Sequence, residues 1–311
     1  MVTIVIVNWN SGPWLSKCLA SLREHAPGCE IVIVDNASQD ESLEGIPDQQ
    51  PLLHVLRNAE NAGFAAACNQ GWLAGEGQRL LFLNPDTECL PGSVETLTRR
   101  LEGDSSIWAL GGHLIDPSGS SQTGFNIRGF PSVGAAAAEL LLLDRIWPRN
   151  PWTRRYRVAG RDPDSGGDVD QPAAACLMVR RAVLSAMGGF DERFRPAWFE
   201  DVDLCRRIRD AGGRIVYEPD ARFRHAGAVS LGRLSREEFL RHYHDNQIRY
   251  FAKHHGPEAA GRVRRLIITG LRLRAALAAL GAGRGRGGAT ASAGVYWKLA
   301  NRLAANPELP R

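Results

Sequence analysis

Apolar residues in the first part of the chain gather in short continuous runs, each of which ends in polar residues. The runs are rich in Val, Ile and Leu, as expected of strands buried on both faces of a sheet. Between them, apolar residues recur every three or four positions, which predicts amphipathic helices. The predicted strands are "TIVIVNWN" (3–10), "EIVIVDNAS" (30–38), "LLHVLRN" (52–58), "RLLFLNPD" (79–86) and "IWALGGHLI" (107–115), and the predicted helices span 13–25, 61–75 and 91–103. This alternation predicts an α/β fold, with a mostly parallel, Rossmann-like sheet flanked by helices.

Polar side chains collect where the predicted strands end. They are Asn8, Asn10, Asp35, Asn36, Asn84 and Asp86. In open α/β sheets, ligands bind beyond the carboxyl ends of the strands. Three strands that deliver Asn or Asp to the same edge therefore predict a ligand site there. A single strand ending in Asp is ordinary turn chemistry, so coincident turns are the alternative.

The pattern changes after residue 115. Residues 116–172 are irregular and rich in Gly, Pro, Ser and Arg, with one apolar helical stretch at 133–147. Residues 174–194 predict a strand, a short helix and a Gly-Gly turn, and "GRIVYEP" (213–219) predicts a further strand. From about residue 233 the pattern is helical, with one helix over 235–256 and an Arg-rich one over 261–283. The Gly/Arg-rich stretch 281–294 reads as a flexible linker.

Composition and charge narrow the class of protein. The chain has 311 residues, of which 44% are apolar and 23% charged, as in soluble globular proteins, and its net charge of +4 is too small to predict nucleic-acid binding. The six cysteines follow no zinc or disulfide spacing, so we expect buried thiols in a reducing compartment. No basic leader and no apolar stretch of about 18 residues is present. These features predict a cytoplasmic protein.

Three carboxylates crowd the stretch "AWFEDVDLCRR" (197–207). A helix predicted from about residue 200 to 211 places Glu200, Asp201 and Asp203 in its first turn, where the helix dipole stabilises negative charge. Asp203 can reach Arg206 or Arg207 across one turn. On the residues alone, acids that only stabilise a helix start and acids that carry chemistry are equally supported.

Six stretches together resemble glycosyltransferase family 2, whose members are inverting, nucleotide-sugar-dependent enzymes with the GT-A fold, and the match is closest to a bacterial rhamnosyltransferase-like branch. The stretches are "VIVNWN", "VDNAS", "NAGFAAACNQG", "LNPD", "GGFDERF" and "WFEDVDLCRR", and they occur in the family's order. The resemblance implies a GT-A domain over 1–232, with a nucleotide-binding half (1–115) and an acceptor and catalytic half (116–232). A helical C-terminal extension over 233–311 would follow it.

For the nucleotide, the resemblance implies a pocket around Asp35, whose carboxylate would accept a hydrogen bond from a pyrimidine base. Asn8, Asn10 and Asn36 would lie around the same pocket. The helix start at Asn61, Gly63 and Phe64 would bring backbone amides close to an anion. A tightly packed helix start is the alternative for those residues.

For the diphosphate, the resemblance implies a cation site. Asn84 and Asp86 occupy the place of the family's D-x-D motif, with an amide instead of the first acid. Asp86 and His225 are then the expected ligands of Mg²⁺ or Mn²⁺, which would stabilise the negative charge of the leaving group. A structural histidine is the alternative at position 225.

For the acceptor, the resemblance implies that Asp201 is the general base, with Glu200 holding the acceptor or a neighbouring hydroxyl. Trp198 and Phe199 would form a flat platform for a sugar, or else anchor the helix in the core. The reaction would be a single in-line displacement that inverts the anomeric carbon. Asp203 would be structural, through its arginines.

The resemblance to the rhamnosyltransferase-like branch favours dTDP-rhamnose as the donor, with UDP-hexoses as the alternative, and a glycan or lipid-linked acceptor. A non-catalytic sugar-nucleotide-binding protein is a further alternative. The Arg-rich C-terminal helices predict either peripheral contact with the inner face of the membrane or a helix packed on the main domain with Arg facing water. No nucleic-acid partner is expected.

Overall fold

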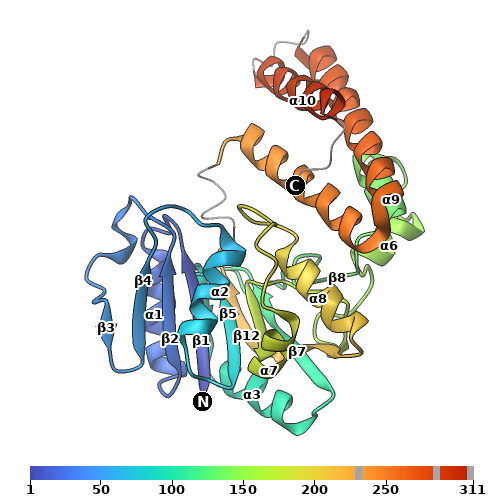
Figure 1. Cartoon of the computed structure of the whole chain (residues 1–311). Helices are drawn as coiled ribbons and strands as arrows, with labels where there is room; N and C mark the ends of the chain where they lie inside the picture. The colour runs from blue at the N-terminus through green and yellow to red at the C-terminus, as the bar shows by residue number, and fades with distance from the viewer. Residues whose placement is uncertain (228–233, 283–287, 307–311) are drawn as a thin grey trace. The chain divides into compact units, whose positions relative to one another are not determined.

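The computed structural model describes residues 1–227, 234–282 and 288–306. The chain divides into two units (Figure 1). Met1–Phe130 with Gly160–Arg233 form the sheet unit, and Pro131–Ala159 with Leu234–Arg311 form the helical unit. All of the candidate site residues predicted above belong to the sheet unit.

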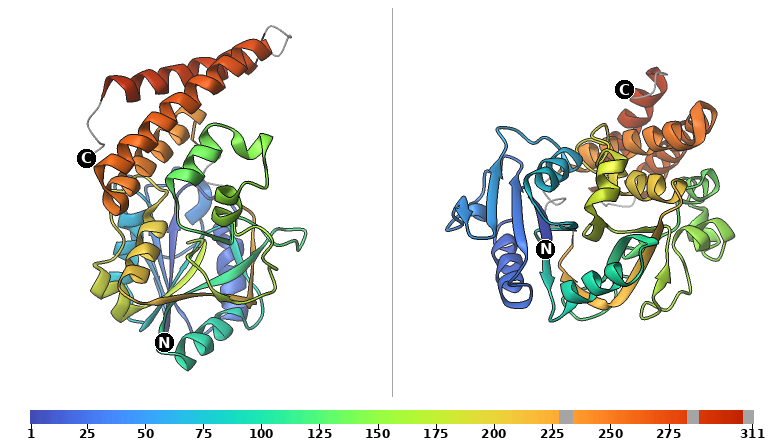
Figure 2. Two further views of the ribbon diagram at one scale, coloured as in Figure 1. Left: turned by 90° about the vertical axis from the view of Figure 1, so that its right-hand side faces the viewer. Right: turned by 60° about the horizontal axis from the view of Figure 1, so that its bottom comes forward.

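Four parallel strands form the first half of the sheet, in the order β4 (Leu53–Arg57), β2 (Glu30–Asp35), β1 (Val2–Asn8) and β5 (Arg79–Leu83). Helices α1 (Trp14–His25) and α2 (Phe64–Ala74) flank this half, and α3 (Ser93–Gly103) packs on β7 (Ile107–Ile115) and β12 (Arg214–His225) of the second half (Figures 1 and 2). The predicted α/β class with flanking helices is confirmed. In the register of the sheet, Asn8 is paired with Asp35, so the polar ends of β1 and β2 lie side by side.

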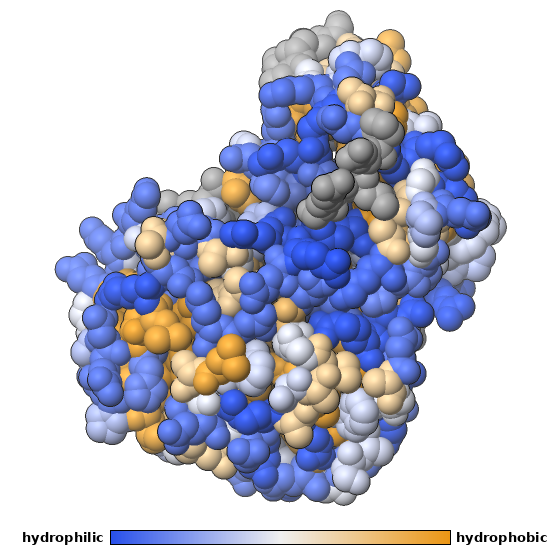
Figure 3. Space-filling view, in the orientation of Figure 1, coloured by the Kyte–Doolittle hydropathy of each residue, from blue (hydrophilic) through white to orange (hydrophobic). Residues whose placement is uncertain are grey.

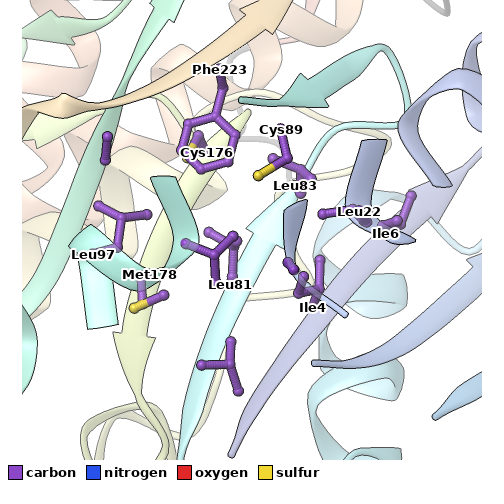
Figure 4. Packing of buried hydrophobic residues seen from close by; sticks show 14 of the residues in the cluster. Ile4, Ile6, Leu22, Leu81, Leu83, Cys89, Leu97, Cys176, Met178 and Phe223 are labelled. Carbon is purple, nitrogen blue, oxygen red and sulfur yellow. The ribbon is translucent and has the colours of Figure 1, made fainter. Parts of the chain in front are cut away.

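The sheet is packed differently on its two faces. On one face, Ile4, Ile6 and Leu81 join Leu22 of α1 and Leu97 of α3 in the main apolar cluster (Figure 4). On the other face, α2 lies so close that a Cβ atom at Gly71 would be 2.3 Å from Val5 Cγ1. Both faces are therefore covered, which is why the strands are continuous apolar runs.

The second half of the sheet is mixed, where the sequence predicted a mostly parallel arrangement. β11 (Cys176–Arg180) lies antiparallel between β5 and β7 (Ile107–Ile115), and β12 (Arg214–His225) lies parallel to β7. The reason is that the excursion after β7 begins and ends at the carboxyl edge of the sheet, so the chain can only re-enter in the opposite direction. β6 (Thr87–Cys89) then pairs antiparallel with β12, and this register places Thr87 opposite His225.

The remaining elements of the sheet unit are short or lie next to the candidate acids. They are η1 (Glu41–Leu43), β3 (Gln49–Gln50), β8 (Ile127–Arg128), β9 (Gly167–Asp168), β10 (Gln171–Pro172), α7 (Arg181–Met187) and α8 (Glu200–Asp210). The predicted helix from residue 200 thus starts where expected. The cysteines are free thiols and all but Cys29 are buried, as predicted.

The helical unit consists of α4 (Val133–Leu140), α5 (Leu143–Ile146), α6 (Pro151–Tyr156), α9 (Arg236–Ala282) and α10 (Gly288–Ala305). The helix predicted over 133–147 is interrupted at Leu142, where φ is 59°. α9 contains both predicted tail helices and turns between them at Gly256, where φ is 80°. α10 packs on α9 through pairs such as Lys298 Nζ with Glu237 Oε1 (2.7 Å).

Two parts of the helical unit differ from the sequence prediction. Residues 131–159 fold with the C-terminal helices and not with the acceptor half, because Arg274 of α9 donates to the backbone carbonyls of Glu139 and Leu140. Residues 281–282 and 288–294, predicted as part of a flexible linker, are helical, and 283–287 lie outside the described residues. No helix within 1–227, 234–282 and 288–306 combines the length and hydropathy needed to cross a membrane.

Candidate active site

The ends of β1 and β2 are joined by a polar network around Asp35. Its carboxylate accepts from the Asn8 amide (2.8 Å), the Ser38 hydroxyl (2.6 Å) and the Ser38 N–H (3.1 Å). Asn8 is completely buried and also bonds to Ser11 and Ser42, so it supports Asp35 instead of lining a pocket. A carboxylate has about four lone-pair sites. Asp35 therefore keeps the capacity for one further donor.

Asn10 and Asn36 connect neighbouring loops to these strand ends. Asn10 has a left-handed φ of 50°, and its side chain accepts from the backbone N–H of Gln39 (2.7 Å). The Asn36 amide donates to the Gly63 carbonyl (3.3 Å) and accepts from Asn58 (2.8 Å). The loop after β2 is thereby fixed against the start of α2.

The start of α2 binds the loop that precedes the candidate acids. The N–H of Gly63 donates to Asn61 Oδ1 (2.9 Å), and the N–H of Phe64 donates to the Pro196 carbonyl (2.7 Å). Two amides expected to face an anion thus have protein acceptors instead. Gly63 has a φ of 90°, and a Cβ atom there would be 3.1 Å from the same Pro196 oxygen. Only glycine suits this contact, which ties the start of α2 to the loop before α8.

Asp86 and His225 face each other, with Asp86 Oδ1 3.4 Å from His225 Nε2, and both side chains are buried. The other oxygen, Asp86 Oδ2, accepts from the N–H of Gly227 (3.1 Å). His225 Nδ1 lies 2.8 Å from Gln122 Oε1, while Gln122 Nε2 donates to the His225 carbonyl (2.8 Å). Because an amide oxygen only accepts, Nδ1 carries a proton, and a neutral His225 presents the Nε2 lone pair to Asp86.

These two residues fit a divalent cation that shares its coordination with a substrate. In the part of the chain that the structure describes, no cluster of three or more His, Cys, Asp or Glu side chains could hold a metal ion. Cations bound through one or two protein ligands usually complete their shell with substrate phosphates and water. The pair therefore suits a diphosphate-bound cation better than a permanent structural metal.

Asp201 lies beside the turn that carries Asn84. Its Oδ2 atom accepts from the N–H of Ala174 (3.3 Å), and the carbonyl of the next residue, Ala175, accepts from the N–H of Asn84 (3.1 Å). Asp86 follows Asn84 by two residues. The structure thus brings the acid at the start of α8 to the same edge of the sheet as the expected cation ligands.

The two acids at the start of α8 differ in their electrostatics. Glu200 is buried, its Oε2 atom has no hydrogen-bond partner among the described residues, and burial, reinforced by the Asp201 carboxylate, raises its pKa well above the usual range. Burial also raises the pKa of Asp201, but the N–H groups of Val202 (2.8 Å) and Ala174 and the charge of Arg128 oppose the rise. The pair therefore combines a carboxyl whose pKa is strongly raised with one whose rise is opposed, and such a difference separates acid from base at many active sites.

The aromatic residues before α8 hold different positions. Trp198 and Phe199 have φ values of 77° and 74°, a conformation that is strained for residues with side chains. Phe199 is only 5% exposed, so it anchors the helix and has little surface to offer a sugar. Trp198 is partly exposed and is the aromatic that can contact a ligand.

Asp203 makes the ion pair expected of a structural residue. It is completely buried and accepts from Arg207 Nε (2.8 Å), and Arg207 also donates to the carbonyls of Met187 and Gly189. Arg206, the other candidate, pairs with Asp210 (2.9 Å). This network fixes α8 to the end of α7.

Sequence reasoning missed three residues of this edge, Gln122, Phe125 and Arg128. Gln122 orients His225, Phe125 stacks on the His225 ring with 5.2 Å between ring centroids, and Arg128 acts on Asp201. All three come from 122–128, a part of the irregular stretch 116–172 that has no clear periodicity and none of the six family-like stretches. No signal in a single sequence marks them.

Comparison with known proteins agrees with this geometry. The family model for "Glycosyl transferase family 2" matches residues 3–184. The chain is 32% identical to the N-acetylglucosaminyl-diphospho-decaprenol L-rhamnosyltransferase of Mycobacterium tuberculosis, over 82% of this chain and 86% of that protein. It is 28% identical to the pre-mycofactocin glycosyltransferase of the same species, over 74% and 43%.

Two solved structures share the fold. GalNAc-T7 with UDP, GalNAc and Mn²⁺ aligns with a TM-score of 0.55 at 20% identity, covering 72% of this chain and 43% of that one. The mannosyltransferase PcManGT of Pyrobaculum calidifontis with GDP-Man and Mn²⁺ aligns with a TM-score of 0.53 at 16% identity, covering 99% and 88%. The family match over residues 3–184 and the 32% identical relative show that this chain belongs to glycosyl transferase family 2 and is a glycosyltransferase.

Proposed function

We propose that this protein transfers L-rhamnose from dTDP-rhamnose to a hydroxyl of a lipid-linked glycan, with N-acetylglucosaminyl diphospho-lipid as the model acceptor. The observation that carries this proposal is the 32% identity with a rhamnosyltransferase across 82% of the chain. The reaction takes place at the cytoplasmic face of the membrane, where a lipid-linked acceptor is accessible.

Donor binding uses the edge formed by β1, β2 and β5. Asp35 has room for one more donor and accepts the N–H of the thymine base, while Asn8 and Ser38 hold its carboxylate in place. Asp86 and His225 would hold a Mg²⁺ or Mn²⁺ ion beside the diphosphate. Such an ion, when bound, neutralises the negative charge that develops on the leaving group. Gln122 keeps the Nε2 atom of His225 available for this purpose.

Transfer itself depends on Asp201. The acceptor hydroxyl oxygen attacks the anomeric carbon while Asp201 removes its proton, the bond from that carbon to the diphosphate oxygen breaks, and the nucleoside diphosphate leaves. One displacement inverts the anomeric configuration. Asp201 must be ionised to act, and the N–H groups of Val202 and Ala174 favour that form. Glu200, whose pKa is raised by burial, donates a hydrogen bond to the acceptor or a neighbouring hydroxyl in its protonated form, and Trp198 contacts the face of a sugar.

A donor screen tests this proposal. Purified protein is incubated with dTDP-rhamnose, UDP-glucose, UDP-N-acetylglucosamine and GDP-mannose, each with and without Mn²⁺ or Mg²⁺, and with a short-chain N-acetylglucosaminyl diphospho-lipid as acceptor. We expect product from dTDP-rhamnose only, with a large increase on adding the cation.

Transfer from a UDP-hexose alone would replace the donor and keep the mechanism. Binding of nucleotide sugars without any transfer, unchanged in Asp201→Asn, would show a binding protein and would refute the catalytic assignment. Equal rates after exhaustive chelation would remove the cation from the proposal.

A further inference from the structure

One surface of the helical unit is not used by the chemistry proposed above. It spans residues 141–159, which include α5 and α6, and we call it the α5–α6 surface. The sequence analysis placed this stretch in the irregular acceptor half. In the structure it belongs with the C-terminal helices and carries both large apolar side chains and arginines.

The apolar side chains of the α5–α6 surface face outward. Ile146 is 82% exposed, Trp147 50% and Trp152 46%. Single exposed apolar residues are common on protein surfaces, but three large ones within seven positions form a patch that usually has a partner. The hydropathy colouring of Figure 3 shows a mainly hydrophilic face with isolated apolar patches.

Local hydrogen bonds hold these side chains in place. Asn150 is completely buried, its amide donates to the Trp147 carbonyl (2.8 Å), and its Oδ1 atom accepts from the N–H of Thr153 (2.8 Å), which caps α6. On α4, a Cβ atom at Gly134 would be 2.3 Å from Trp152 Cδ1, so the Trp152 ring packs on the helix at that glycine. These contacts fix the turn between the two tryptophans, so the fold itself directs Trp147 outward.

The charge of the α5–α6 surface is strongly positive. Residues 141–159 contain five arginines and one acid, which gives a net charge of +4. Arg157 pairs with that acid, Asp144 (2.8 Å). The four others, Arg145, Arg149, Arg154 and Arg155, are exposed. Arginine binds phosphate oxygens through a planar fork, so these groups are suited to a layer of phosphates.

We infer that the α5–α6 surface docks on an anionic lipid bilayer, with Ile146 and the two tryptophans entering the headgroup region and the four arginines binding lipid phosphates. Tryptophan and arginine together at an exposed apolar patch match the chemistry of the membrane interface. A second copy of the chain is disfavoured as the occupant, because two surfaces of charge +4 repel each other. The inference deepens the proposed function, since a lipid-linked acceptor lies in such a bilayer.

Two arginines in the Arg-rich part of α9 are bound within the helical unit. Arg264 donates to the carbonyls of Leu303 and Asn306, and Arg274 donates to the carbonyls of Glu139 and Leu140. These two arginines stabilise the helical unit internally, so they are not available for lipid phosphates in the way that the sequence suggested.

Vesicle co-sedimentation of the full-length chain tests the inference without donor or acceptor, so its outcome is independent of the donor screen. Vesicles of phosphatidylcholine alone are compared with vesicles containing one quarter phosphatidylglycerol. We expect binding to the anionic vesicles only. The double variant Ile146→Ser with Trp147→Ser should bind at least about tenfold more weakly, and Arg149→Gln with Arg154→Gln about thirtyfold more weakly.

Leu280→Ser is the matched control, because Leu280 of α9 is 74% exposed and lies outside the α5–α6 surface. It should bind like the unmodified protein. Unchanged melting temperatures show that all variants fold. The inference is overturned if the unmodified protein ignores anionic vesicles, if the Ile146 and Trp147 variant binds normally, or if Leu280→Ser alone removes binding. A concentration-dependent dimer that the Ile146 and Trp147 variant abolishes would identify a second copy as the partner instead.

Discussion

Replacing Glu200 by Gln should make the protein more stable at neutral pH and remove part of its pH dependence. Glu200 is buried beside Asp201, and its Oε2 atom has no partner among the residues that the structure describes. Burial raises the pKa of this carboxyl, so the folded protein keeps a proton that the unfolded chain releases. Gln has the shape of the protonated acid and cannot ionise.

The magnitude follows from proton linkage. The unfolded carboxyl titrates near the ordinary glutamate pKa of about 4.3. Because the pKa is raised by folding, the contribution of this group to stability is complete below that pH and is lost as the pH rises toward the folded pKa. Over this window the loss is about 1.4 kcal/mol for each pH unit. The Gln variant lacks this loss. An amide NH₂ without an acceptor at the Oε2 position would cost about 1–3 kcal/mol, but equally at every pH.

Urea unfolding at pH 5, 6 and 7 measures the effect. The difference in unfolding free energy between Glu200→Gln and the unmodified protein should shift in favour of the variant as the pH rises, by up to about 1.4 kcal/mol per pH unit. Glu95→Gln is the control, because Glu95 lies on the exposed side of α3 and pairs only loosely with Arg99. If the unmodified protein and Glu200→Gln show parallel pH dependences, the Glu200 carboxyl does not hold its proton in the folded state and the reasoning fails.

Three further predictions concern catalysis, the cation and packing. Asp201→Asn should lower kcat about 10²–10⁴-fold with nucleotide binding retained, and unchanged turnover would show that Asp201 is not the base. In the unmodified enzyme, the rate should fall as acid protonates Asp201, at a pH above the ordinary aspartate pKa of about 4. Gln122→Leu should weaken Mn²⁺ binding about 10–100-fold, measured by titration with dTDP present, because His225 loses its orienting acceptor, and an unchanged affinity would contradict this role. Gly71→Ala should lower the free energy of unfolding in urea by about 1–3 kcal/mol, because the added Cβ atom would overlap with Val5. Gly103→Ala is the control and should be neutral or stabilising, because the space around Gly103 is open; equal effects of the two variants would refute the close packing of α2.

The strands of the first half of the sheet and the polar residues at their ends could be predicted because their sequence signals are local. Continuous apolar runs gave the parallel strands, and the polar residue that ends each strand necessarily lies at one edge of a parallel sheet. The pairing of Asn8 with Asp35 follows directly from this rule. The start of α8 was also predictable, since acids collect in the first turn of a helix for a physical reason that one sequence reveals.

Other features depend on contacts between distant segments and could not be read in this way. The direction of β11 is set by where the excursion after β7 returns, and the sequence of that excursion has no period. The roles of Gln122 and Phe125 exist only because the pairing of β12 with β7, which sets Arg224 opposite Ile115, brings His225 to the segment that follows β7. Residues 288–294 illustrate a different problem, because glycine favours a linker whereas alanine favours a helix, so the local preferences of this stretch conflict.

The hydrogen bond from the Phe64 amide to the Pro196 carbonyl has a consequence for altering the specificity of this enzyme. It joins the nucleotide half directly to the loop that delivers Asp201, with Gly63 pressed against the same oxygen. Substitutions that reshape residues 61–64 would also displace the loop before Asp201, which is the base in the proposed mechanism. Engineering of the donor and of the acceptor is therefore coupled in this protein, and libraries that vary 61–64 and 195–199 together should recover active enzymes that separate libraries miss.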